Sequence, residues 1–210
     1  GVDDAWAVVD ETLDYLEHDR SHPAGGYTEA VRGDGSLADR PRRQNPHMHL
    51  FEALLALYDA TGDDRCLERA AHLFDLVCTR FMVDGTLREY FTEDLEPAPG
   101  EKGRIVEPGH HMEWVWLLHR YAVLSGDRSA VQTAEALYAF ALANGYDIRS
   151  GGVIDEVTDG GQAIKESRRL WPQTEALKGH VARYRHTGDA NTLVRVEKGV
   201  ALLIQEHLHE

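Results

Sequence analysis

The chain has 210 residues, an apolar content of 42% and a net charge of −14 at neutral pH. This length and composition allow one sizeable hydrophobic core, so we expect a single domain over residues 1–210. The negative charge disfavours nucleic acid and anionic membrane surfaces as partners, and no apolar run approaches the ~20 residues of a transmembrane helix.

Apolar residues recur at a spacing near 3.6 in seven segments, which predicts an all-α fold. The expected helices are 2–18, 47–60, 64–80, 110–124, 128–143, 172–186 and 190–207. Cys66 and Cys78 both fall on the third helix and lack metal-ligand spacing. They fit a chain kept reduced in the cytoplasm, and the acidic N-terminus is unlike a signal peptide.

The helices are arranged in pairs that repeat along the chain. A Thr/Ser-Gly-Asp turn recurs at 61–63, 125–127 and 187–189, and Pro46, Pro108 and Pro172 mark the start of each pair. Proline suits the first helical turn, glycine supplies a left-handed C-cap, and aspartate can cap the next helix. A unit of about sixty residues repeated three times predicts a helical solenoid or a closed toroid.

Glycine turns separate the units. They lie at 25–26, 84–85 and 151–152, and each leads into a short β-prone stretch. Behind them come long polar loops such as 92–107, and loops of this length are often functional. We therefore expect short β-hairpins between the helix pairs.

Polar and aromatic residues gather at three helix starts. If the repeated units pack side by side, these starts converge at one end of the bundle. Such a mixture suits a polyhydroxylated ligand, because aromatic rings cover C–H groups while polar groups bind hydroxyls. The candidates are Arg43, Asn45, His49 and Glu52 at the first start, His110, Glu113 and Trp114 at the second, and Trp171, Gln173 and Glu175 at the third.

His110 and Glu113 lie three positions apart on one helix face, as do His49 and Glu52. A carboxylate at this spacing can accept the imidazole N–H and fix its tautomer, as a general acid/base histidine requires. The alternative is a local helical pair beside a partly buried histidine.

Other candidates also have structural alternatives. His47 and His49 diverge by roughly 200° on a helix, so we expect no metal site from this pair. Trp114 and Trp116 diverge likewise, so only one of them lines a cavity while the other packs in the core. Arg43 could belong to a solvated loop, and Glu175 could merely favour the helix dipole.

Three segments in order, 45–53, 108–114 and 171–176, resemble the N-acylglucosamine 2-epimerase superfamily. This superfamily includes cellobiose 2-epimerases and aldose–ketose isomerases of mannose and sulfoquinovose. The sequences of these segments are most similar to the branch of D-mannose isomerases, also described as mannose-6-phosphate isomerase-like. The resemblance implies an (α/α)6 barrel of six inner and six outer helices, with a pocket at the inner-helix N-termini.

The resemblance also implies chemistry without a metal or other cofactor. Two histidines move the C2 proton of an open-chain sugar, and in the family pattern His110 matches one of them and Glu113 its orienting carboxylate. His49 and Asn45 match substrate-binding residues, and Trp171 and Glu175 match pocket residues. The second catalytic histidine matches nothing in these 210 residues.

Family chains are about twice as long, so we expect a partial barrel lacking N-terminal and C-terminal helix pairs, or a homodimer that covers the exposed inner surface. The expected activity is aldose–ketose isomerisation of the mannose–fructose type. The alternatives are an N-acylglucosamine or cellobiose type 2-epimerase and a non-catalytic carbohydrate-binding repeat protein.

Overall fold

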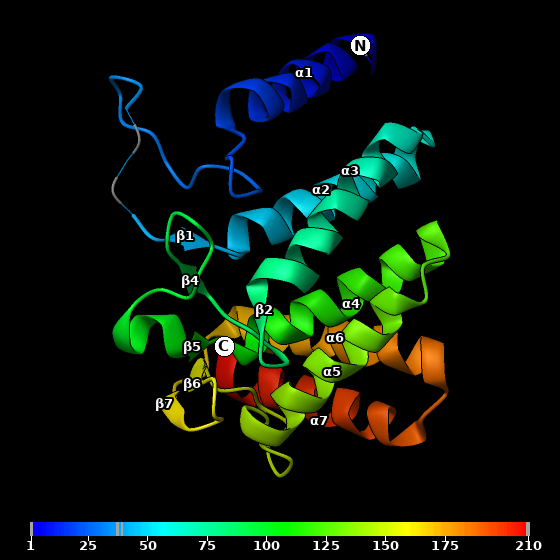
Figure 1. The fold of residues 1–210 in the computed structure, drawn as a ribbon. Coiled ribbons are helices and arrows are strands. Elements are labelled where there is room, and N and C mark those ends of the chain that lie inside the picture. The colour runs from blue at the N-terminus through cyan, green and yellow to red at the C-terminus, as the bar shows by residue number, and fades with distance from the viewer. Residues whose placement is uncertain (1, 37, 39, 209–210) are drawn as a thin grey trace.

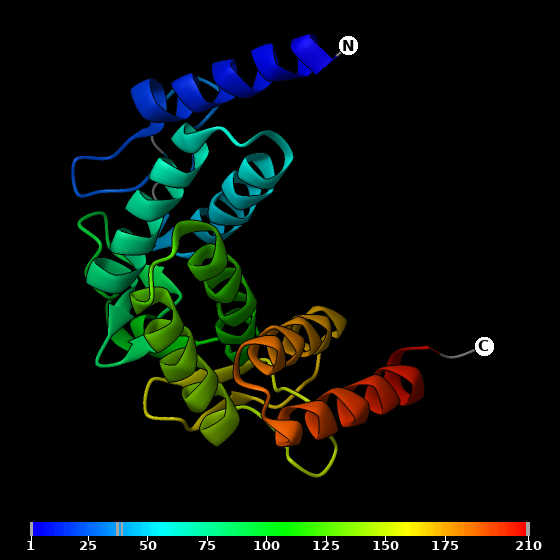
Figure 2. The same ribbon diagram turned by 90° about the vertical axis from the view of Figure 1, so that its right-hand side faces the viewer.

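The computed structural model describes residues 2–36, 38 and 40–208. They form a curved row of helical hairpins, with α1 at one end and α7 at the other (Figures 1 and 2). The helices α2, α4 and α6 each pair with the helix that follows, and α4 also packs against α2 and α6. The helices are α1 Val2–Tyr15, α2 Asn45–Thr61, α3 Asp64–Leu76, α4 Pro108–Ser125, α5 Ser129–Asn144, α6 Leu170–Thr187 and α7 Ala190–His207.

The repeated turns end the first helix of each pair as expected. Gly62, Gly126 and Gly188 adopt φ values of 69°, 76° and 69°, a left-handed conformation that glycine accepts without strain. Asp63 and Asp189 then cap α3 and α7, each accepting a hydrogen bond from a backbone N–H two residues on. The sequence thus predicts where each hairpin turns.

The observed helix boundaries differ from the predicted ones at the starts of three helices and at the ends of two others. The helices α2, α4 and α6 begin two residues earlier than predicted, since proline is tolerated throughout the first turn, where backbone N–H groups have no intrahelical partner. The helices α1 and α3 end earlier and continue as π-helical turns, Leu16–Arg20 and Val77–Phe81.

Short antiparallel strands lie near the N-terminal ends of α2 and α4. Of the three predicted glycine turns, the one at 84–85 joins two of these strands, whereas those at 25–26 and 151–152 are flanked only by isolated bridges, Ser21 with Tyr27 and Tyr146 with Val153. β1 (Arg42–Arg43) pairs with β4 (Tyr90–Phe91), β2 (Met82–Val83) with β3 (Thr86–Leu87), and β6 (Glu156–Thr158) with both β5 (Ile105–Val106) and β7 (Ala163–Lys165). Since β1 leads into α2 and β5 into α4, these pairings fix where both helices start.

The core is centred on α4, which is buried on nearly every side from Pro108 to Tyr121. Trp114 and Tyr121 pack their rings on Phe51 of α2, with centroids 5.2 and 5.4 Å apart. Such aromatic clusters dominate core energetics, and removing one ring typically costs about 3–5 kcal/mol.

Within the described ranges, every helix is too short or too polar to traverse a bilayer.

Candidate active site

The N-terminal turns of α2, α4 and α6 meet at one end of the helical row. Asn45 of α2 places Nδ2 3.0 Å from Nε2 of His110 on α4. Trp171 of α6 lies on the other side of the same imidazole, with ring centroids 4.8 Å apart. Gly109 permits this approach, because a Cβ there would lie 2.9 Å from the Trp171 ring. The three helix starts singled out in the sequence therefore converge.

The carboxylate paired with His110 is Glu89, not the expected Glu113. Nδ1 of His110 lies 3.0 Å from Oε2 of Glu89, and Gln44 donates a hydrogen bond to the same oxygen at 3.0 Å. Glu89 is buried in the short segment between β3 and β4. Helical side chains lean toward the helix N-terminus, so His110 reaches the preceding loops rather than the next turn, which carries Glu113.

This pairing shifts the pKa values of both His110 and Glu89. Burial alone would lower the pKa of His110, but Glu89 first and then Glu107 outweigh it and raise that pKa to about 9. Burial likewise would raise the pKa of Glu89, yet the charge and hydrogen bond of His110 keep it lowered. At neutral pH the pair is ionic, with Nδ1 turned to Glu89 and Nε2 turned to Asn45.

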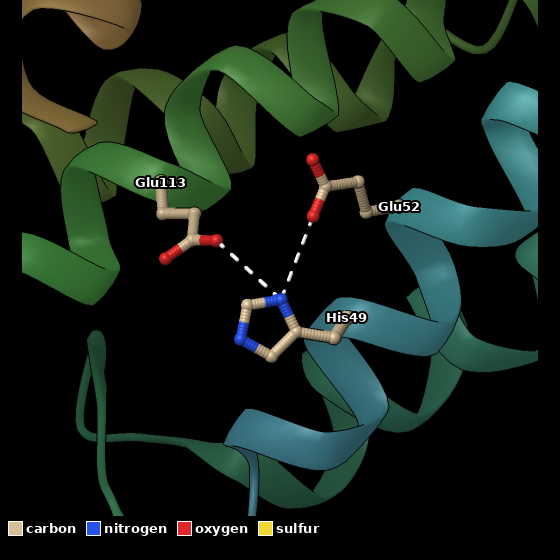
Figure 3. Close-up of side chains that lie close together, drawn as sticks. All are labelled: His49, Glu52 and Glu113. Carbon is tan, nitrogen blue, oxygen red and sulfur yellow. Dashed lines mark hydrogen bonds and ion pairs between the residues drawn. The ribbon is translucent and has the colours of Figure 1, made fainter. Parts of the chain in front are cut away.

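A second cluster joins α2 to α4, close to the first. Nδ1 of His49 lies 3.5 Å from Oε2 of Glu52 and 3.7 Å from Oε1 of Glu113, between the two carboxylates (Figure 3). Both distances exceed those of a good hydrogen bond. Glu113 is buried, and desolvation together with the nearby charge of Glu175 raises its pKa to about 7. The cluster can therefore exchange a proton near neutral pH.

Trp116, rather than the predicted Trp114, contacts Glu175 at the third helix start. Its Nε1 donates to Oε2 of Glu175 at 2.8 Å, and Lys178 pairs with the same carboxylate oxygen at 2.7 Å. Trp114 is fully buried in the core and donates to Oε1 of Gln44 at 2.8 Å. The divergence of the two tryptophans was predicted correctly, but their assignment was reversed.

Two other predicted binding residues have their polar groups engaged by the protein. Gln173 accepts a hydrogen bond from the backbone N–H of Val153 and donates to its carbonyl, both at 2.8 Å, so it holds the glycine turn before α6. Arg43 donates from Nε to Oε1 of Glu29 at 2.6 Å. Neither residue contacts the His110 pair through these bonds.

Among the described residues, two sets of side chains bring three possible metal-ligand atoms within 4.8 Å of one another. They are His49–Glu52–Glu113 and Glu89–Glu107–His110. The second set is buried and its members already pair with each other, with Gln44 and with Arg169. His47 contributes to neither, since it is buried and accepts a hydrogen bond from the backbone N–H of Tyr27 at 3.0 Å. The expectation of chemistry without a metal remains a prediction.

The row of helical hairpins, with its polar cluster at the N-termini of α2, α4 and α6, has the fold of the helical-barrel proteins. All 210 residues match the model of one family, described as N-acylglucosamine 2-epimerase (GlcNAc 2-epimerase). The chain belongs to the N-acylglucosamine 2-epimerase family, which confirms the resemblance drawn from its three motifs and the helical-barrel fold.

Individual relatives agree with this assignment. The chain is 40% identical over 173 residues to a mannose-6-phosphate isomerase of Rhizobium meliloti (strain 1021), covering 79% of this chain and 43% of that protein. A D-mannose isomerase crystal structure superposes with a TM-score of 0.88 at 24% identity, covering 98% of this chain and 54% of the other. A cellobiose 2-epimerase from Spirochaeta thermophila DSM 6192 gives 0.79 at 27% identity, covering 99% and 54%. The chain thus spans about half the length of these relatives.

Proposed function

We propose that these residues form the sugar-binding and proton-transfer part of an aldose–ketose isomerase that acts on an open-chain aldose of the mannose type. The observation that carries the proposal is the His110 imidazole, held between Glu89 and Asn45 with its ring against Trp171. A histidine whose tautomer is fixed by a buried carboxylate has the arrangement of a general acid/base. The family and the mannose isomerases among its relatives support this choice of substrate.

In the proposed reaction the neutral form of His110, which becomes populated as pH approaches its pKa of about 9, takes the proton from C2 of the aldose on Nε2. The C–H electron pair forms the C1=C2 double bond, and the aldehyde oxygen accepts a proton to give an enediol. His110 then returns a proton to C1, while the hydroxyl at C2 loses its proton and becomes the ketone. Glu89 stabilises the imidazolium that forms in the first step, since its carboxylate lies 3.0 Å from Nδ1.

In this proposal, the second cluster transfers protons to and from the sugar oxygen atoms O1 and O2. Glu113 has a pKa of about 7, so it can both give and accept a proton at O1 or O2 near neutral pH. His49, whose side chain is 54% exposed, is accessible to a hydroxyl group of the sugar. The faces of Trp171 and Trp116 suit the C–H surface of a sugar chain, as aromatic walls do in ligand pockets.

Epimerisation at C2 is the second candidate, favoured by the 27% identity to a cellobiose 2-epimerase. It shares the first proton transfer and differs only in where the proton returns. Return to the opposite face of C2 requires another acid on that side of the substrate. The product therefore distinguishes the two reactions.

Proton NMR in deuterated water tests the proposal with mannose, glucose and N-acetylglucosamine as separate substrates. We expect loss of the C2 proton signal of mannose and growth of fructose signals. His110→Gln should abolish both, whereas His49→Ala should act mainly through KM. EDTA should leave the rate unchanged. Absence of both exchange and mannose binding, or activity that EDTA removes and a divalent metal restores, would contradict the proposed function.

A further inference from the structure

Two carboxylates lie near the same ring nitrogen of His110. Oε2 of Glu89 is 3.0 Å from Nδ1 and pairs with it, whereas Oε2 of Glu107 is 4.0 Å from the same atom. Glu107 immediately precedes α4 and lies three positions before His110, a spacing at which side chains of one helical turn can meet. A further contact must therefore decide which of the two carboxylates binds Nδ1.

That contact comes from Arg169, the residue that precedes α6. Its Nη2 donates to Oε2 of Glu107 at 2.9 Å, the same oxygen that lies 4.0 Å from Nδ1 of His110. Burial raises the pKa of Glu107, and the positive charges of His110 and Arg169 oppose this rise. Since a direct hydrogen bond between charged groups is much stronger than a contact at 4.0 Å, Arg169 holds Glu107 away from Nδ1.

Arg169 is itself fixed by Asp155, which immediately precedes β6. Nε of Arg169 lies 3.1 Å from Oδ1 of Asp155, and the backbone N–H of Arg169 donates to the same oxygen at 3.0 Å. Asp155 is buried, and Ser167 donates to its other carboxylate oxygen at 2.7 Å. Because both the backbone and the guanidinium are bound to one buried carboxylate, the direction of the Arg169 side chain is fixed.

The same guanidinium contacts a second neighbour of His110. Cζ of Arg169 lies 5.2 Å from the ring centroid of Trp171, within the range of a cation–π contact. Trp171 in turn lies 4.8 Å from the imidazole of His110, measured between ring centroids. Arg169 therefore binds two groups that adjoin His110, the Glu107 carboxylate and the Trp171 ring.

We propose that Arg169 is a positioning residue for His110, which binds Glu107 and so leaves Nδ1 to Glu89 and Nε2 directed toward the substrate. This inference rests on the proposed function, because it concerns the orientation of the imidazole for proton transfer at Nε2. Arg169 acts through Glu107 and does not touch the reacting atoms. Without Arg169, the ion-pair partner left to Glu107 among the described residues is His110, so Glu107 competes with Glu89 for Nδ1.

NMR of the 210-residue protein with nitrogen-15 labelled histidine tests this proposal at neutral pH and needs no substrate. Glu89→Gln identifies the Nδ1–H signal of His110, because it alters the partner of that group. We expect Arg169→Met and Arg169→Gln each to shift this signal, since Glu107 is released in both. Arg168→Met is the matched control, because the neighbouring Arg168 pairs with acidic side chains outside the His110 cluster.

A double variant separates positioning from a merely structural role. Arg169→Met combined with Glu107→Gln should restore the wild-type Nδ1–H signal, because the competing carboxylate is then absent. Circular dichroism of each variant verifies that the helices are intact. An unchanged signal in the folded Arg169 variants, an equal shift in Arg168→Met, or a double variant without recovery would each overturn the proposal.

Kinetics of isomerisation give a second readout. Arg169→Met should lower kcat by up to about 100-fold, as misplacement of a reacting group by about 1 Å can do. It should raise KM less, because Trp171 keeps its contacts with His110 and Gly109. A variant in which only KM changes would contradict the positioning role. Absence of isomerisation in the wild-type protein would count against the proposed function, and the NMR comparison would still decide whether Arg169 orients His110.

Discussion

Replacing Glu89 by glutamine should convert His110 from a charged to a neutral group at physiological pH. The glutamine keeps the shape of the side chain and can still accept the hydrogen bond from Gln44. It removes the largest influence that raises the pKa of His110, while the burial that lowers this pKa stays. The pKa should therefore fall from about 9 toward the ordinary value of 6.5, because only Glu107 and Glu113 are then left to oppose the effect of burial.

The size of the effect on stability follows from proton linkage. The rise from 6.5 to about 9 corresponds to about 3 kcal/mol, at about 1.4 kcal/mol per pH unit. Because the folded-state pKa of His110 lies above the unfolded value, this stabilisation is complete below pH 6.5 and is lost as pH rises through 9. Between about pH 7 and about pH 8.5 the wild-type free energy of unfolding should fall by about 2 kcal/mol. The Glu89→Gln variant should lose only the smaller part that Glu113, with its pKa of about 7, contributes over the same range.

Urea unfolding across this pH range measures the difference, and NMR titration of carbon-13 labelled histidine reports the pKa of His110 directly. Buried histidines with lowered pKa, such as His47 and His111, change charge at lower pH and do not contribute to the slope. Glu96→Gln, an exposed change in the next loop, is the control. If Glu89→Gln keeps the wild-type slope and histidine titration, Glu89 does not hold the proton on His110, and the reasoning is refuted.

Two further results are expected. Glu113→Gln should raise Tm at pH 8 and leave it unchanged near pH 4.5. The reason is that a carboxyl group whose folded-state pKa is raised to about 7 destabilises the fold once it ionises. Equal Tm values for the wild type and the variant at pH 8 would contradict this. Gly109→Ala should destabilise the protein by about 1–3 kcal/mol and displace Trp171 from His110, since its Cβ would lie 2.9 Å from that ring. Gly33→Ala, with open space around the added carbon, should have little effect in the same urea titration, and a similar loss in both variants would argue against the contact.

The helix pairs and their convergence were predictable because their signals are local. Proline at the first turn and the Gly-Asp pair at the hairpin act through backbone conformation, and each occurs at the same place in three units. The convergence of Asn45, His110 and Trp171 follows from that repetition alone. Equivalent positions of packed repeats meet at one end of the stack.

The partner of His110 could not be predicted in this way. Glu89 stands in a short loop with no motif, and its backbone N–H donates to the carbonyl of Ile105, in the strand that leads into α4. The choice between Trp114 and Trp116 failed for a related reason. A helix packed on several sides has no solvent face, so its apolar spacing does not indicate which side faces the site.

The burial of α4 on nearly every side also limits which amino-acid substitutions this protein tolerates. Almost any substitution between Pro108 and Tyr121 alters packing against a neighbouring helix, so the helix that carries His110 has little freedom to vary. The loops upstream of α4 and α6 also carry exposed side chains, such as Arg104 and residues 162–167, which have fewer packing constraints. Directed evolution toward new sugars should therefore draw its productive mutations from these loops, and combinatorial libraries are best placed there.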